Sequence, residues 1–234
     1  MSFIFKQFSV EDTDCSMKVG TDAVLLGAWV DAPQTGRVLD IGTGCGLLAI
    51  MVAQRSEAMI TAIEIDQPSA AQAHNNFINS PWSSRMDVRT ISLQNYAATC
   101  PGYFNLIITN PPFFVNSLKT PHAARSLARH NDELPFSVLA AISAELLSKN
   151  GILSLILPIK EAKLFHGYAV NSGLYMTKQL SVTPLKNKPP NRMLMEFSKQ
   201  PAEKGVSESL TIRNIDGTYT DAYKSLTKDF YLNF

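Results

Sequence analysis

Three glycines alternate with other residues in segment 42–46, directly after a short apolar run that ends at Ile41. Glycines at this spacing allow positive φ angles and let a ligand approach the main chain closely. Asp40, two residues before the first glycine, would repel a pyrophosphate but suits a cationic amino group. Glu64 ends the next apolar run, where an acid can hold ribose hydroxyls. The spacing therefore favours a ligand that carries both a ribose and a cationic amino group.

A second set of residues suited to chemistry is the turn Asn110-Pro111-Pro112-Phe113, which follows an apolar run at 104–109. Prolines fix φ and cannot continue a sheet, so the turn is expected to sit rigidly at the end of a strand. The side-chain carbonyl of Asn110 and the main-chain carbonyl of Pro111 can accept both hydrogens of an NH2 group. Two such acceptors favour a pyramidal nitrogen and hold charge as it develops. Phe113 offers a flat apolar face on which a base or an amide can stack.

The two turns together resemble motifs I and IV of Rossmann-like S-adenosylmethionine methyltransferases; motif IV is written D/N-P-P-Y/F in enzymes that methylate amino groups. The resemblance implies S-adenosyl-L-methionine as the cofactor and methyl transfer to an exocyclic amine, with much of the acceleration supplied by positioning. No metal and no covalent nucleophile are required. Each turn also has a plainer interpretation, as a structural glycine turn in another α/β enzyme or an Asn-Pro turn after a buried strand. The expected catalytic residues are Asn110, Pro111, Pro112 and Phe113.

A closer resemblance extends over essentially the whole chain. Residues 17–29, MKVGTDAVLLGAW, are similar to the N-terminal signature of the bacterial tRNA1(Val) (adenine-37-N6)-methyltransferase family. This resemblance implies that an adenine in tRNA, adenine 37 of a valine tRNA, is methylated on its N6 amine. The remaining matches are FKQF at 5–8, Cys15, NPPFF at 110–114, ARH at 128–130, YT at 219–220 and DFYL at 229–232.

The resemblance also assigns cofactor contacts. The segment before the glycine turn reaches over the methionine tail in such enzymes, so Lys18 and Thr21 are expected to bind the carboxylate. Ser92 and its neighbour Leu93 would flank the adenine; many relatives carry Asp at position 92, and a hydroxyl there weakens one contact. Lys18 as a solvated lysine and Ser92 as a plain strand terminus are the alternatives. The expected cofactor-binding residues are Lys18, Thr21, Asp40, Gly42, Gly44, Gly46, Glu64, Ser92, Leu93 and Asn110.

Basic residues in two loops are candidates for RNA binding. One loop follows Phe113, and the other, 186–192, is stiffened by prolines. Both could hold phosphates beside the site, although either could be a solvated polar loop. A base in an anticodon loop is nearly single-stranded, so extruding it costs less than from a duplex. The expected RNA-binding residues are Arg125, Arg129, Lys186, Lys188 and Arg192.

These residues must be positioned by alternating strands and helices. The pattern predicts an α/β, Rossmann-like methyltransferase fold: a seven-stranded, mostly parallel sheet with an antiparallel C-terminal hairpin strand and helices on both faces. The helix that starts at Pro135 is expected to be closed by Asn150-Gly151, a favourable C-cap pair. Strands are expected at 37–41, 59–63, 87–92, 104–109, 152–157, 174–182 and 193–198, and helices at 46–55, 67–79, 135–149 and 160–171.

The two ends of the chain complete the expected organisation. A strand at 3–10 is predicted to pair with 15–19 across the polar turn 11–14, and a helix begins at Asp22. The tail adds a strand at 209–213 and a helix at 220–230. No linker divides the chain, so a single methyltransferase domain, 1–234, is expected. Its parts are an N-terminal hairpin and helix that cover the cofactor (1–33), a catalytic core (34–200) and a C-terminal extension (201–234).

Composition narrows the class further. The 234 residues are 45% hydrophobic, which is ordinary for a globular domain, and the net charge of +1 requires any RNA contact to use a local patch. Three dispersed cysteines argue against a disulfide scaffold or a zinc site and indicate a reducing, cytoplasmic compartment. The N-terminus lacks the apolar core of a signal peptide, and no apolar run is long enough to span a bilayer. We therefore expect no membrane, no metal and no obligate protein partner.

Other functions share parts of this pattern. The same proline turn serves enzymes that methylate glutamine in release factors, guanine N2 in rRNA or adenine in DNA. Release-factor enzymes usually carry a helical domain before the glycine turn, guanine enzymes often have His where Phe114 stands, and DNA enzymes usually add a recognition domain. A non-enzymatic RNA-binding or cofactor-sensing module and a nicotinamide dehydrogenase are the remaining alternatives. They are separated from a methyltransferase by substitution of Asn110 and by cofactor titration.

Overall fold

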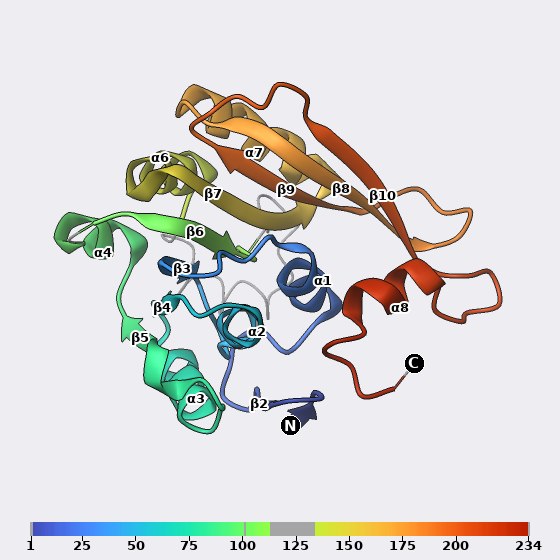
Figure 1. Ribbon diagram of the computed structural model, residues 1–234, viewed down its shortest axis with the longest axis horizontal. Coiled ribbons are helices and arrows are strands. Elements are labelled where there is room, and N and C mark those ends of the chain that lie inside the picture. Colours follow the sequence, from blue (N-terminus) through green and yellow to red (C-terminus); the bar gives the residue numbers. More distant parts are fainter. Residues whose placement is uncertain (1, 101, 113–133, 234) are drawn as a thin grey trace, which may run out of the picture.

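The apolar runs of the sequence form the strands of one eight-stranded sheet in the computed structural model, which describes residues 2–100, 102–112 and 134–233 (Figure 1). The strand order is β10-β8-β9-β7-β6-β3-β4-β5. All neighbours are parallel except β9, which runs antiparallel to β7 and β8. The strands are β3 (Arg37–Ile41), β4 (Met59–Glu64), β5 (Met86–Thr90), β6 (Phe104–Thr109), β7 (Leu147–Pro158), β8 (Tyr175–Leu185), β9 (Arg192–Ser198) and β10 (Val206–Arg213).

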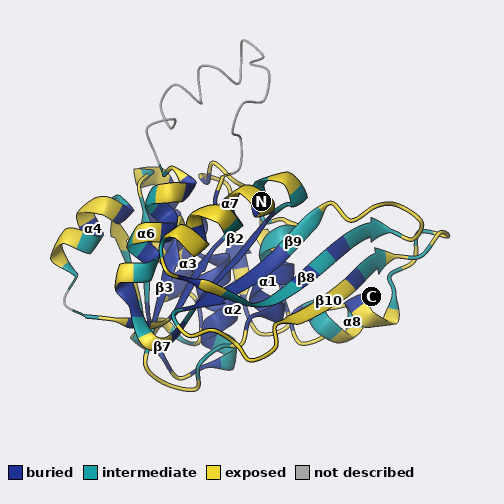
Figure 2. Ribbon diagram, turned by 90° about the horizontal axis from the view of Figure 1, so that it is seen from above, coloured by how far each residue is buried: buried dark blue, intermediate teal, exposed yellow. Residues whose placement is uncertain are grey.

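Helices cover both faces of this sheet, as predicted for continuous apolar strands. Successive residues of a strand face opposite sides, so Val38 packs into one core and Leu39 into the other. The first core contains α1 (Thr21–Trp29), α2 (Leu47–Arg55), α3 (Gln67–Ile78) and α8 (Asp221–Thr227), and the second contains α4 (Leu93–Thr99), α6 (Phe136–Leu146) and α7 (Ile159–Asn171). A 3-10 helix, η1 (Ser83–Arg85), leads into β5. Figure 2 shows the central strands buried and the edge strand β10 largely exposed.

The fold class is confirmed, but within the described residues the sheet has eight strands and not seven. The eighth strand is β10, which contains the strand predicted in the C-terminal tail and begins three residues earlier. It pairs in parallel with β8, from Val206 opposite Lys178 to Arg213 opposite Leu185. The tail is therefore part of the main sheet and forms its edge.

The predicted helix end at Asn150-Gly151 is wrong. Helix α6 ends at Leu146, and β7 starts at Leu147, which is fully buried opposite Phe104. A Cβ on Gly151 would lie 2.5 Å from the carbonyl oxygen of Phe104. The glycine thus permits close approach of β7 to β6, a role that a turn signal in the sequence does not distinguish from a helix cap.

The predicted N-terminal pairing is also wrong. The hairpin lies entirely within residues 2–11, where β1 (Ser2–Ile4) pairs with β2 (Ser9–Glu11). Residues 15–19 form no strand, because Asp12 binds this segment: its carbonyl accepts from Cys15 N, and its carboxylate accepts from Val19 N. The predicted helix is present as α1, one residue earlier than expected.

Candidate functional site

The glycine turn and the proline turn leave neighbouring strands at the same edge of the sheet. Strands β3 and β6 are parallel partners, with Ile41 opposite Thr109. The Thr109 hydroxyl donates to the Ile41 carbonyl at 2.8 Å and ties the two strand ends together. Gly42 and Asn110, the next residue of each strand, therefore start side by side at the carboxyl edge, where open α/β sheets bind ligands.

All three glycines of the turn have positive φ, but they differ in their surroundings. Gly42, Gly44 and Gly46 have φ values of 68°, 56° and 85°. A Cβ on Gly46 would lie 2.5 Å from the ring of Phe77, whereas a Cβ on Gly42 or Gly44 would meet no atom of the described residues within 4 Å. Gly46 is thus required by packing within the protein, while the other two glycines line open space. That space is the cradle expected for a ligand that approaches the backbone.

Two carboxylates flank this turn. Asp40 is fully buried, and its Oδ2 accepts hydrogen bonds from Thr43 Oγ1 (2.6 Å) and Ala49 N (3.2 Å). Burial raises the pKa of Asp40 to about 7, although these hydrogen bonds oppose the shift. Its buried Oδ1 has no hydrogen-bond partner among the described residues. Asp40 therefore offers one acceptor to a donor that the described residues do not provide.

Glu64 ends β4 and holds the turn from the other side. Its Oε2 accepts from Gly44 N at 2.9 Å, and its Oε1 accepts from the backbone N–H groups of Ile65 (2.8 Å) and Asp66 (3.0 Å). The carboxylate is thus fixed beside the middle glycine. This is the position that the sequence predicted for a residue that holds ribose hydroxyls.

The proline turn presents a second unpartnered acceptor. Asn110 is half-buried, and its Oδ1 is buried without a hydrogen-bond partner among the described residues. Pro111 is buried and Pro112 exposed, so the chain turns outward directly after the strand. Phe113 lies outside the described residues. A buried amide oxygen without a donor is costly to the fold, and an incoming N–H group would satisfy it.

The segment before α1 lies against the glycine turn. Cys15 and Cys45 are buried in the same core, and the interaction with Cys45 lowers the pKa of the Cys15 thiol. Lys18 Nζ donates to the carbonyls of Asp12 and Thr13, and Thr21 begins α1 with its side chain exposed. The structure thus brings this segment and the turn together through two cysteines that are far apart in the sequence.

Ser92 and Leu93 lie at the start of a helix that the sequence did not reveal. The third strand ends at Thr90, and Ser92 is the N-cap of α4, with its hydroxyl accepting from Asn95 N at 3.2 Å. Leu93 is buried in the core beneath it. A single serine cap shortly after a strand is a weak helix signal for an element of only seven residues, so the sequence pattern extended the strand to Ser92 instead.

The basic candidates divide into two groups. Lys186 and Lys188 are exposed in the turn between β8 and β9. Arg192 is partly buried and forms an ion pair with Asp22 of α1 at 2.7 Å, a contact that no sequence pattern predicts. Arg125 and Arg129 lie outside the described residues.

Two kinds of feature are absent from residues 2–100, 102–112 and 134–233. Within these ranges no three His, Cys, Asp or Glu side chains gather into a possible metal site. No helix there has the length and apolar character needed to cross a membrane.

Comparison with known proteins gives one consistent result. The methyltransferase small domain family matches residues 9–134. The chain is 44% identical over 237 residues to the tRNA1(Val) (adenine(37)-N6)-methyltransferase of Trichodesmium erythraeum, covering 99% of this chain and 98% of that protein. It is 40% identical over 230 residues to the protein of the same name from Parabacteroides distasonis, covering 98% and 97%. A crystal structure of a predicted O-methyltransferase from Agrobacterium tumefaciens shares the fold, with a TM-score of 0.69 and 20% identity over 89% of this chain and 96% of that one.

Proposed function

Because the chain belongs to the tRNA1(Val) (adenine(37)-N6)-methyltransferase family, we propose that it transfers a methyl group from S-adenosyl-L-methionine to the N6 amine of adenine 37 in a valine tRNA. The observation that carries this proposal is the pairing of Ile41 with Thr109. It places the open glycine turn beside Asn110, so a methyl donor and an amine can meet at one edge of the sheet.

The residues at the glycine turn fit the cofactor. Gly42 and Gly44 line open space, and the unpartnered Oδ1 of Asp40 is suited to a cationic amino group. When bound, S-adenosyl-L-methionine supplies an electrophilic methyl group on a sulfonium centre. We assign the glycine backbone and Asp40 to the methionine part and Glu64 to the ribose. The other residues assigned to cofactor binding are Lys18, Thr21, Gly46, Ser92, Leu93 and Asn110.

The chain's own contribution to the reaction is to hold the amine. An adenine N6 is a poor nucleophile because its lone pair is delocalised into the ring. The Oδ1 of Asn110 accepts one N–H of the amine and the carbonyl of Pro111 accepts the other, which favours a pyramidal nitrogen. The unpartnered state of Asn110 Oδ1 supports this role, because the amine would supply the missing donor. Pro112 fixes the turn and Phe113 stacks on the base.

The remaining assignments concern the RNA and the chain as a whole. We assign Arg125, Arg129, Lys186, Lys188 and Arg192 to the phosphates of the tRNA. We also propose that residues 1–234 act as one methyltransferase domain in the cytoplasm, where tRNA is modified. In this arrangement residues 1–33 cover the cofactor, 34–200 form the catalytic core and 201–234 extend it.

The test is methyl transfer to an unmodified transcript of a valine tRNA with labelled cofactor, followed by nucleoside mass spectrometry. We expect N6-methyladenosine at position 37. Asn110→Ala should lower kcat about 100- to 1000-fold, because one preorganised hydrogen-bond partner of the reacting group is lost. Asn110→Asp should keep more activity, since a carboxylate also accepts. Asn171→Ala, at an exposed position on α7, is the matched control and should behave as wild type.

Three outcomes would overturn the proposal. The first is transfer to a guanine in rRNA, to a release factor or to DNA in parallel assays, with none to tRNA. The second is full activity of Asn110→Ala. The third is calorimetric binding of NAD but not of S-adenosyl-L-methionine.

A further inference from the structure

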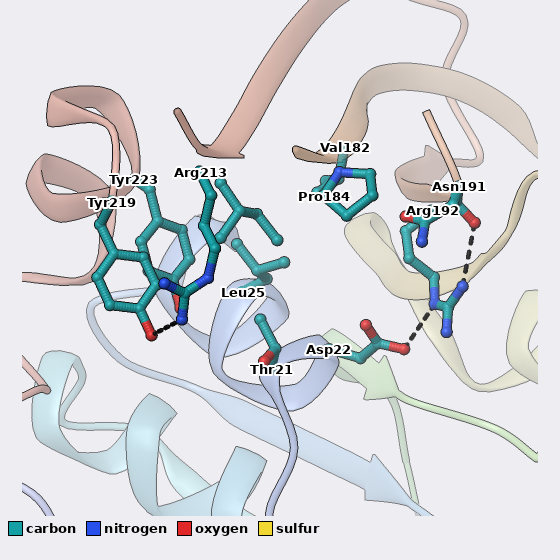
Figure 3. A pocket seen from close by; sticks show the side chains of 11 residues that line it. Thr21, Asp22, Leu25, Val182, Pro184, Asn191, Arg192, Arg213, Tyr219 and Tyr223 are labelled. Carbon is teal, nitrogen blue, oxygen red and sulfur yellow. Dashed lines mark hydrogen bonds and ion pairs between the residues drawn. The ribbon is translucent and has the colours of Figure 1, made fainter. Parts of the chain in front are cut away.

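A cavity of about 340 Å³ lies where α1, β10 and the loop after β10 meet (Figure 3). This volume is at the lower end of the range for small-ligand pockets, roughly 300–1,000 Å³. Two arginines line it from different strands: Arg192 at the start of β9 and Arg213 at the end of β10. Asp22 is the only acidic side chain of the lining, which therefore carries a net charge of +1 among the described residues.

The guanidinium of Arg213 is held in place by its own loop. Nη1 donates to the carbonyl of Gly217 at 2.6 Å and Nη2 to the hydroxyl of Tyr219 at 2.8 Å. The guanidinium carbon lies 4.0 Å from the centre of the Tyr219 ring. These contacts use two of the five N–H donors of an arginine, so three remain for a ligand.

Arg213 also differs from Arg192 in having no counter-ion in the part of the chain that the structure describes. Among the described residues no carboxylate forms an ion pair with it, and its side chain is exposed. Arg192 differs, because Asp22 binds it at 2.7 Å (Figure 3). A fixed, exposed guanidinium without a carboxylate is the arrangement that binds phosphate, since its planar fork matches the phosphate oxygens.

The loop behind Arg213 is tied to the core by ring stacking and a backbone hydrogen bond. The rings of Tyr219 and Tyr223 stack with their centres 5.0 Å apart, and Tyr223 is only 1% exposed. Thr220 N donates to the carbonyl of Ile212 at 3.0 Å, which fastens the loop to β10. Arg213 therefore rests on a stack that is anchored in the core, and little side-chain entropy would be lost when it binds a ligand.

The cavity opens at the same edge of the sheet as the proposed catalytic turns. Strands β7, β8 and β10 run in one direction, so the end of β10 at Arg213 and the end of β6 at Thr109 share the carboxyl edge. Four strand steps separate β6 from β10, which is roughly 19 Å at about 4.8 Å per step. A contact at Arg213 is thus too far away to touch the reacting base.

We propose that this cavity binds a backbone phosphate of the RNA substrate, outside the nucleotide that is methylated, with Arg213 as the contacting residue. The inference rests on the proposed function and extends it with a separate anchor for the RNA. The cavity gives the substrate a second point of attachment on the sheet edge, and its effect is on RNA affinity rather than on the chemical step.

The test compares Arg213→Gln with Arg89→Gln. Arg89 is the matched control, because it also lies beside a tyrosine ring, at 5.8 Å from that of Tyr96, but on the opposite edge strand. Filter binding of the valine tRNA transcript is measured at several salt concentrations. We expect Arg213→Gln to weaken binding about tenfold. The plot of the logarithm of the association constant against the logarithm of the salt concentration should become less steep by about 0.7 to 0.9, as for the loss of one phosphate contact. KM for tRNA should rise while kcat and the cofactor Kd stay unchanged.

An unchanged salt slope and KM for Arg213→Gln would overturn the inference. A fall in the slope for Arg89→Gln of the same size would also overturn it, because the effect would then be one of net charge alone. Arg213→Lys keeps the charge and serves if Arg213→Gln unfolds; it should preserve the salt slope but weaken binding several-fold, and wild-type affinity would contradict the planar contact. If wild-type protein fails to methylate tRNA, the proposed function fails; if it methylates tRNA and Arg213→Gln is unaffected, only this inference fails.

Discussion

Replacing each of two glycines in the same turn by alanine separates a role in folding from a role in ligand binding. Gly44 and Gly46 both have positive φ, so alanine is strained at either position. They differ in what a methyl group would meet. At Gly44 it would enter open space, whereas at Gly46 it would lie 2.5 Å from Cε1 and 3.2 Å from Cζ of Phe77. The ring of Phe77 is 2% exposed and cannot swing into solvent.

The expected costs follow from these contacts. A left-handed backbone conformation costs a non-glycine residue about 1–2 kcal/mol, and this applies to both variants. Gly46→Ala adds overpacking of about 1–3 kcal/mol, because the buried ring must shift. Gly44→Ala should therefore lower the free energy of unfolding by about 1–2 kcal/mol, and Gly46→Ala by about 2–5 kcal/mol.

Cofactor affinity should show the opposite order. The methyl group of Gly44→Ala would occupy the space assigned to S-adenosyl-L-methionine, so the Kd should rise about tenfold or more, equivalent to about 1.4 kcal/mol. Gly46→Ala, where folded, should bind the cofactor more tightly than Gly44→Ala does. Urea unfolding gives the stabilities, and calorimetric titration gives the affinities. A folded Gly44→Ala variant with wild-type affinity for S-adenosyl-L-methionine would refute the assignment of this turn.

Two further predictions use buried carboxyl groups. Burial raises the pKa of Asp40 to about 7, so the carboxyl is about half protonated at pH 7. Cofactor binding at this pH should release about half a proton, because the cationic amino group of the cofactor stabilises the carboxylate. Calorimetric titrations in buffers of different ionisation enthalpy measure this release, and a value of zero would contradict the prediction. Burial also raises the pKa of Glu196 from 4.5 to about 7, so the folded protein binds this proton more tightly than the unfolded chain does. The stability gained from the bound proton is fully present below pH 4.5 and is lost as the pH rises through 7. The free energy of unfolding of Glu196→Gln, measured with urea, should therefore rise by up to about 3 kcal/mol relative to that of the wild type between pH 5 and pH 8.5. A difference between the two proteins that stays constant with pH would refute this.

The strands next to the site were predictable because each is a continuous apolar run that ends in a special turn. β3 and β6 have the predicted bounds, and their turns could be recognised from the residues alone. A parallel sheet places the carboxyl ends of such strands on one edge, so the juxtaposition of Gly42 and Asn110 follows from local patterns.

Features that depend on contacts between distant segments could not be predicted. Gly151 after Asn150 has the pattern of a helix cap, and only the approach of Phe104 shows that it belongs to a strand. The contact between Cys15 and Cys45 and the ion pair between Asp22 and Arg192 join residues that no spacing rule connects. The tail strand was expected, but its pairing with β8, and thus the position of Arg213 at the sheet edge, was not.

The fold forgoes stability at the place where the two turns meet. A buried acceptor without a donor costs about 1–3 kcal/mol, and both Asp40 and Asn110 carry one. Three positive φ angles follow Asp40, at Gly42, Gly44 and Gly46, and of these only the one at Gly46 serves internal packing. Ligands that supply donors to these two oxygens and occupy the space beside Gly42 and Gly44 would offset those costs. The binding free energy of cofactor and amine therefore includes the relief of penalties already present in the folded chain, which is why substitution at Asn110 should affect catalysis far more than folding.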